Sequence, residues 1–145
     1  MNNKQKKKYL MQYTELKQEL TELELRYNEL KETMIDPPIQ KLSHTPIENS
    51  NPNTFKIVNQ IVKQEDLEDK KKDVLEKFLK IENIINNIDD SLQRRIMKLR
   101  YLDNYKWENI CVKINYSWIH THRLHSIALS KIEIIWYTMV HFFIL

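Results

Sequence analysis

The stretch that decides the fold is WENICVKINYSWIHTHRLHSIAL, residues 107–129. Its first part predicts a short helix over about 107–113, because apolar side chains recur there at helical spacing. Asn115 then interrupts the pattern, and Ser117 is a strong N-cap residue for a further helix over about 118–134. The buried face of that last helix is expected at Thr121, Leu124, Ala128 and Ile132.

A third short helix is expected upstream. Asp89, Asp90 and Ser91 supply cap residues for a helix over 92–102, which Asp103 and Asn104 end. Three short helices with a three-residue turn before the last one form the helix-turn-helix pattern. Asn115 stands where this turn commonly has glycine, and the chain contains no glycine at all. Since Asn tolerates the left-handed conformation, we expect it to make the turn.

The rest of the chain predicts a helical arm. Apolar and aromatic residues between Tyr9 and Met34 alternate at spacings of four and three, which indicates a coiled-coil helix over 1–35. A Pro/Asn/Ser-rich connector over 36–54 holds all four prolines, and a second heptad helix is expected over 55–88. The two heptad helices can fold back as a hairpin or pair between chains, and a homodimer is slightly favoured.

The expected organisation is therefore all-α. A helix-turn-helix domain over 89–134 follows the arm, and an apolar C-terminal tail over 135–145 ends the chain. The tail is expected to pack back on the bundle or to bind a partner. The apolar run 134–145 falls short of the roughly 20 residues that a membrane-spanning helix needs, so no membrane association is expected.

Charge is unevenly distributed. The net charge is only +3, yet residues 94–132 hold eight Lys and Arg against two acids. Such a basic segment is typical of nucleic-acid binding, although it is also found on an ordinary solvated face. The single cysteine, Cys111, allows no intrachain disulfide and favours a reducing cytoplasm.

No catalytic constellation is visible, so we expect no enzyme and no cofactor. A chain without glycine has no phosphate-cradling loop, and its serines lack a positioned base. The spacing of His120, His122 and His125 is not a ligand pattern, and no second cysteine exists, so no metal site is expected.

Two stretches carry a resemblance to a known group of proteins. RIMKLRYLDNYKWENIC, residues 95–111, resembles the start of region four of bacterial sigma factors. NYSWIHTHRLH, residues 115–125, and the element PIEN, residues 46–49, are similar to small phage transcriptional regulators of the RinA and ArpU type. The resemblance covers roughly residues 10–133. It departs at Ile119, where the group usually has a polar residue, and at Cys111, which replaces a small alanine.

This resemblance implies a sequence-specific regulator of a phage or prophage element in a bacterial host cell. The last helix enters the major groove of double-stranded DNA with its N-terminal turns leading. Arg123 is the best candidate for a guanine contact, and His125 is a further possible donor. The full set of expected DNA-binding residues is Ser117, Trp118, Ile119, His120, His122, Arg123 and Ser126 for bases and adjacent backbone, with Lys106, Lys113 and Lys131 on phosphates.

Other functions remain open at this stage. By analogy with region four, RNA polymerase is a further possible partner. A phage DNA-packaging or assembly protein of the small-terminase kind also combines a helix-turn-helix with an oligomerising coiled coil. A coiled-coil interaction adaptor would use the arm without binding DNA.

Overall fold

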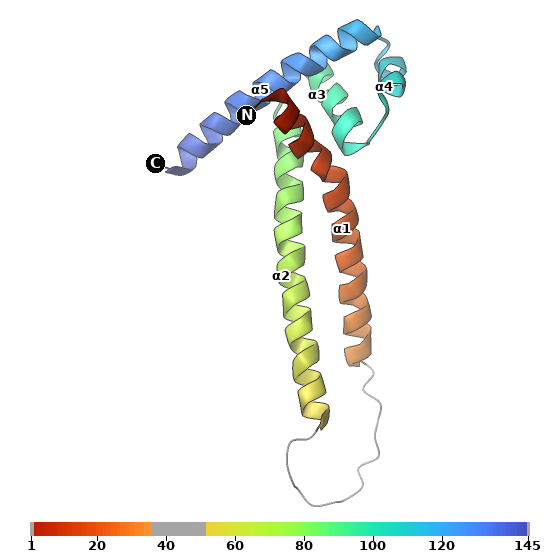
Figure 1. The fold of residues 1–145 in the computed structure, drawn as a ribbon, viewed down its shortest axis with the longest axis vertical. Coiled ribbons are helices and arrows are strands. Elements are labelled where there is room, and N and C mark those ends of the chain that lie inside the picture. The colour runs from red at the N-terminus through yellow and green to blue at the C-terminus, as the bar shows by residue number, and fades with distance from the viewer. Residues whose placement is uncertain (1, 36–51, 145) are drawn as a thin grey trace, which may run out of the picture. The chain divides into compact units, whose positions relative to one another are not determined.

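The computed structural model describes residues 2–35 and 52–144, with side chains over 2–34 and 54–132. The regular structure of those residues is entirely helical, with no strand among them, so the expected all-α class is confirmed (Figure 1). The helices are α1 (Asn3–Ile35), α2 (Pro52–Asn86), α3 (Ser91–Met97), the π-helical turn η1 (Lys98–Leu102), α4 (Trp107–Ile114) and α5 (Trp118–Ile144). Most of the predicted connector, including the PIEN element, lies outside the described residues.

The chain divides into two compact units. We call residues 2–17 and 76–144 the head, and residues 18–35 and 52–75 the arm. Helices α1 and α2 contribute one end to each unit, whereas α3 to α5 belong to the head alone.

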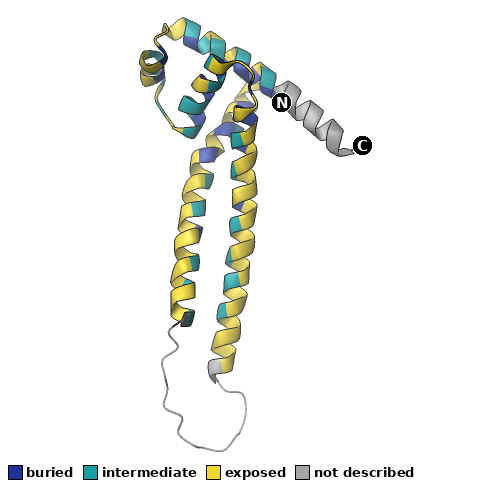
Figure 2. Cartoon of the chain, turned by 180° about the vertical axis from the view of Figure 1, so that it is seen from behind, coloured by how far each residue is buried: buried dark blue, intermediate teal, exposed yellow. Residues whose placement is uncertain are grey.

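The head is built around buried apolar side chains from both ends of the sequence (Figure 2). Tyr13 of α1 stacks on Phe78 of α2, with ring centroids 4.4 Å apart. A smaller cluster of Ile96, Ile110 and Ile114 joins α3 to α4. The main cluster consists of Leu10, Tyr13, Ile81, Ile84, Ile85, Ile88, Met97, Tyr101, Ala128, Leu129 and Ile132.

Helix α3 begins as predicted but ends differently. The Asp90 carboxylate accepts the Gln93 amide at 2.8 Å, which caps the helix. The last turn, however, widens into η1, where the Asp103 amide donates to the Lys98 carbonyl five residues back, at 3.0 Å. The wider turn buries Tyr101, which the regular helical pattern did not assign to the core.

The arm is a hairpin in which the two heptad faces meet within one chain. Leu23 and Val74 are buried between its helices. The hairpin also holds polar contacts, since the Tyr27 hydroxyl donates to Glu68 at 2.6 Å and Lys71 lies 5.0 Å from the centre of the Tyr27 ring. Of the two arrangements that the heptads allowed, the chain by itself adopts the hairpin.

Helix α5 continues beyond its predicted end. The sequence indicated a helix to about residue 134 and a separate tail over 135–145, but α5 runs to Ile144. The predicted boundary is wrong because the apolar run that marks it has no proline or glycine to stop a helix. The side chains of 133–145 lie outside the described residues, so the expectation that the tail packs back on the bundle or binds a partner stays a prediction.

Candidate nucleic-acid interface

The turn between α4 and α5 is set by two residues that the sequence indicated. Asn115 takes the left-handed conformation, with φ 57° and ψ 46°, so that prediction is confirmed. The Tyr116 amide then donates to the Cys111 carbonyl at 3.2 Å, closing the end of α4. The Ser117 hydroxyl accepts the His120 amide at 3.3 Å and caps the start of α5, as predicted.

Thr121 fixes α5 against α4. Its side chain is fully buried, and its hydroxyl donates to the Ser117 carbonyl at 2.9 Å. The Cys111 thiol lies 3.5 Å from the same hydroxyl oxygen. The first contact lies within the start of α5, and the second joins α4 to α5, so the buried hydroxyl has partners on both sides of the turn.

The first turns of α5 present an exposed face. Trp118 is 49% exposed and Ile119 is 80% exposed, so two adjacent large apolar side chains are open to solvent. Arg123 and Ser126 are also exposed, although the Ser126 hydroxyl donates to the His122 carbonyl of its own helix at 3.0 Å. His120 is half-buried and stacks on Tyr116, with ring centroids 4.9 Å apart.

The three lysines expected to hold phosphates lie on different elements. Lys106 is exposed at the N-cap position of α4, and Lys113 is exposed near its end, with its ammonium 4.7 Å from the centre of the Tyr105 ring. Lys131 is half-buried and lies further along α5 than the exposed face. The structure therefore groups Lys106 and Lys113 on α4 and separates Lys131 from them in sequence along α5.

His122 does not present its ring to solvent as the sequence suggested. The ring lies between two indoles, 4.3 Å from Trp107 and 4.6 Å from Trp118 by their centroids. Its Nε2 atom is buried and has no hydrogen-bond partner. Burial lowers the pKa of His122, and the charges of Lys7 and Arg100 add to that effect. His122 is therefore a neutral ring that packs against Trp107 and Trp118 and supports the position of Trp118.

His125 lies in the core, so the expectation that it reaches DNA is wrong. Its ring is buried, and its Nε2 is 2.8 Å from the Tyr101 hydroxyl. Burial raises the pKa of Tyr101 to about 12 and, with Lys7 adding, lowers that of His125 to about 3. The phenol therefore keeps its proton and is hydrogen-bonded to a neutral imidazole. Position 125 follows Thr121 by four residues, which is the signal that places it on the buried face.

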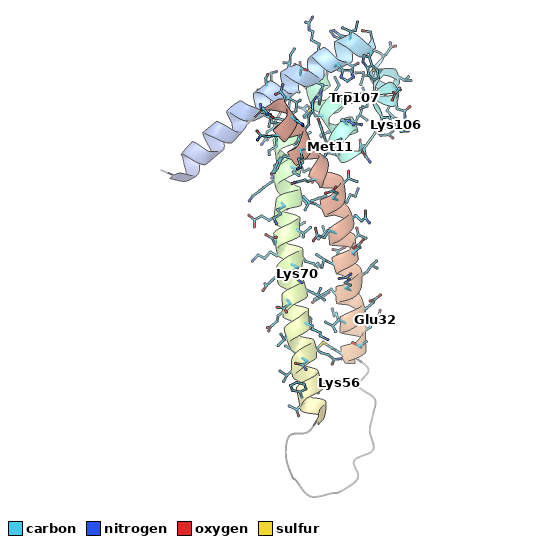
Figure 3. The ribbon with its side chains drawn as sticks, viewed as in Figure 1. Met11, Glu32, Lys56, Lys70, Lys106 and Trp107 are labelled. Atoms are coloured by element: carbon cyan, nitrogen blue, oxygen red, sulfur yellow. The ribbon has the colours of Figure 1, made fainter. Side chains whose placement is uncertain are left out.

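A small pocket of about 90 Å³ lies beside this pair. Lys7 and Met11 of α1, Arg100 of η1 and Trp107 of α4 line it, together with His122 and the Tyr101–His125 pair. Figure 3 labels Met11 on α1 and Trp107 at the start of α4. No pattern in the sequence predicts Lys7 at this place, because only the fold brings the start of the chain to η1.

Comparison with protein families gives one match. The model of a family described as "Protein of unknown function (DUF1492)" matches residues 56–133, more than half of the chain. The chain belongs to the DUF1492 family. The match spans most of α2 and all of η1, α3 and α4, and it includes α5 as far as its described side chains reach.

The family match leaves the activity open. Searches of curated proteins and of solved structures found no match. The resemblance to sigma region four and to RinA/ArpU-type regulators is not part of these findings and stays a proposal.

Two further observations concern the described residues of this DUF1492 member. Over the described residues, no helix is long and apolar enough to cross a membrane. In the same part of the chain, no three side chains of His, Cys, Asp or Glu gather closely enough to hold a metal ion.

Proposed function

We propose that the protein is a sequence-specific DNA-binding transcription regulator of a phage or prophage element, with α5 as its recognition helix. The observation that carries the proposal is the α4–turn–α5 unit, in which Asn115 and Ser117 fix the turn and leave the start of α5 exposed. A helix held in this way with its N-terminal turns free matches the docking geometry of helix-turn-helix proteins.

The chemistry of the exposed face suits base reading. Arg123 carries a planar fork of donors, which matches the O6 and N7 acceptors of guanine. Ile119 offers a branched apolar surface to a thymine methyl group, a contact that would explain why so large a side chain is 80% exposed. Trp118, supported from behind by His122, forms the adjoining wall of this face.

The surrounding charge suits the phosphate backbone. Lys113 is exposed at the end of α4 beside the turn, and Lys106 is exposed at the opposite end of that helix. At such positions cations hold phosphates and set the register without reading sequence. Residues 94–132 carry eight basic groups against two acidic ones, so this surface attracts a polyanion at long range. By analogy with region four, an RNA polymerase contact is a further part of the proposal.

The experiment is fluorescence anisotropy on DNA fragments from the protein's own genomic neighbourhood, across a salt series. We expect one fragment to bind tightly and Arg123→Ala to weaken that complex about 10- to 100-fold, the usual value of a good bidentate base contact. Arg26→Ala is the matched control, since Arg26 is exposed on the arm. The proposal of a sequence-specific regulator would be refuted if every fragment bound equally weakly and Arg123→Ala left that binding unchanged.

A homodimer is a further part of the proposal, because paired recognition helices read two half-sites. The arm offers a surface for it. Phe55, Val58 and Ile61, with Val62, are exposed at helical spacing near the start of α2. At 3.6 residues per turn they lie on the side away from Leu67 and Val74, which face the hairpin seam.

Sedimentation equilibrium tests the dimer. Ile61→Glu is expected to convert dimers to monomers, because it places a charge in the apolar stripe of Phe55, Val58, Ile61 and Val62. Lys63→Glu, exposed on the same helix outside that stripe, is the control. A wild-type protein that sediments as a monomer at all concentrations would contradict the dimer without touching the DNA proposal.

A further inference from the structure

The pocket beside η1 has walls of unusual charge. Lys7 and Arg100 both line it, and no Asp or Glu does. Within the described part of the chain, neither cation has an ion-pair partner. Arg100 is half-buried, and a cation withdrawn from water without a counter-ion is costly. The pocket is therefore electrostatically incomplete.

Two contacts fix the position of the Arg100 guanidinium. Its guanidinium lies 5.1 Å from the centre of the Trp107 ring, and its Nη1 donates to the Tyr105 carbonyl at 3.0 Å. A guanidinium has five N–H donors, so most of them stay available after that bond. The wide turn of η1, a feature that often occurs at functional sites, supplies both Arg100 and Tyr101 to the pocket.

The remaining walls carry no negative charge. The Tyr101 hydroxyl keeps its proton, and the two histidine rings are neutral, so nothing repels an anion. Trp107 opens α4 at the same wall, and no side chain caps the first turn of that helix.

The size of the pocket limits the ligand. A volume of about 90 Å³ is small beside the roughly 300–1,000 Å³ of sites that take drug-sized ligands, and it suits one tetrahedral oxyanion. Planar, multi-donor guanidinium groups bind phosphate oxygens in pairs, whereas an ammonium adds a point charge. Arg100 and Lys7 supply one group of each kind.

We propose that this pocket binds a single phosphate group, with Arg100 as the positioned binding residue and Lys7 as the exposed cation that also lines it. The group is either a backbone phosphate of bound DNA or free inorganic phosphate. The first source rests on the proposed function, and the second is independent of it.

The first arm of the test uses inorganic phosphate and no DNA. In ¹H–¹⁵N spectra of the full chain, the Arg100 Nε–H and Trp107 indole signals are expected to shift saturably with sodium phosphate but not with sodium chloride of equal ionic strength. Lys7→Gln, an exposed position that the fold tolerates, is expected to weaken this binding at least fivefold. Arg26→Gln on the arm is the matched control and is expected to leave it unchanged.

The second arm uses the DNA fragment that binds most tightly. If the pocket takes a backbone phosphate, the same two signals shift on DNA addition, and Lys7→Gln lowers the slope of log K against log salt by about one. If it takes free phosphate, those signals respond to phosphate alone and the slope is unchanged. The proposal is overturned if neither phosphate nor DNA moves the signals saturably. If the protein binds no DNA but its signals saturate with phosphate, the proposal of a transcription regulator fails and the proposal of a phosphate site stands.

Discussion

The head and the arm are made of the same kind of helix, yet they are packed in different ways. In the head, apolar side chains of α1, α2, η1 and α5 meet in one buried cluster. In the described arm, Leu23 and Val74 are buried, while the contacts around them join Tyr27, Glu68 and Lys71. A heptad pattern thus predicts the helices but not how completely their faces are covered. The stability of the chain is expected to reside in the head.

The largest expected effect is that of acid on the stability of the head. The pKa of His125 is about 3 in the folded head, against an ordinary histidine value of 6.5. Because the folded value is depressed, the unfolded chain binds the extra proton between these values, and the free energy of unfolding falls as pH drops from 6.5 towards 3. The fall is at most ~1.4 kcal/mol per pH unit. Urea titrations followed by near-ultraviolet circular dichroism at several pH values measure it.

The control for acid is His125→Gln, which keeps a hydrogen-bonding group without the basic ring. Its unfolding free energy is expected to vary less with pH in that window. An equal pH dependence in both proteins would assign the acid sensitivity to other groups.

A cavity in the head is the next largest change. Ile85 is fully buried in the main cluster, so Ile85→Ala is expected to lower the free energy of unfolding by about 2–5 kcal/mol. Leu79→Ala, at a position 44% exposed on the same helix, is the control and is expected to cost less than half as much. Chemical denaturation measures both. Similar losses from the two variants would mean that the head is no better packed than the helix surface.

The same substitution in each unit gives the smallest and most direct test. Tyr101→Phe leaves the buried His125 Nε2 without its partner and is expected to cost about 1–3 kcal/mol. Tyr27→Phe removes the bond to Glu68, which is exposed to water, and is expected to cost less than about 1 kcal/mol. Thermal unfolding compares the pair. A larger loss from Tyr27→Phe would show that the arm, not the head, carries the stability.

Local rules account for what the sequence predicted. Caps and turns depend on a few neighbouring residues, so Asp90, Asn115 and Ser117 were identified in their roles from the sequence alone. The heptad spacing in the same way predicted α1 and much of α2. These features need no knowledge of the fold.

Features that depend on distant partners were missed. The wide turn η1 follows from packing Tyr101 against α5, which no local pattern encodes. His122 looked outward on a helical wheel, yet the indoles of Trp107 and Trp118 enclose it. Lys7, about ninety residues before Arg100, joins the candidate site only through the fold.

The two left-handed turns of the head have a consequence for the unfolded chain. Asn104 and Asn115, with φ of 56° and 57°, take the role that glycine has elsewhere, in a chain that has none. Glycine would relieve the steric cost of the left-handed state, but it would also widen the set of conformations that folding must narrow. Asparagine accepts some strain in the native turn and keeps the denatured ensemble smaller. Replacing either residue by glycine would relieve the steric cost in the native turn but raise the conformational entropy of the unfolded chain. Because these two effects oppose each other, little net change in stability is expected.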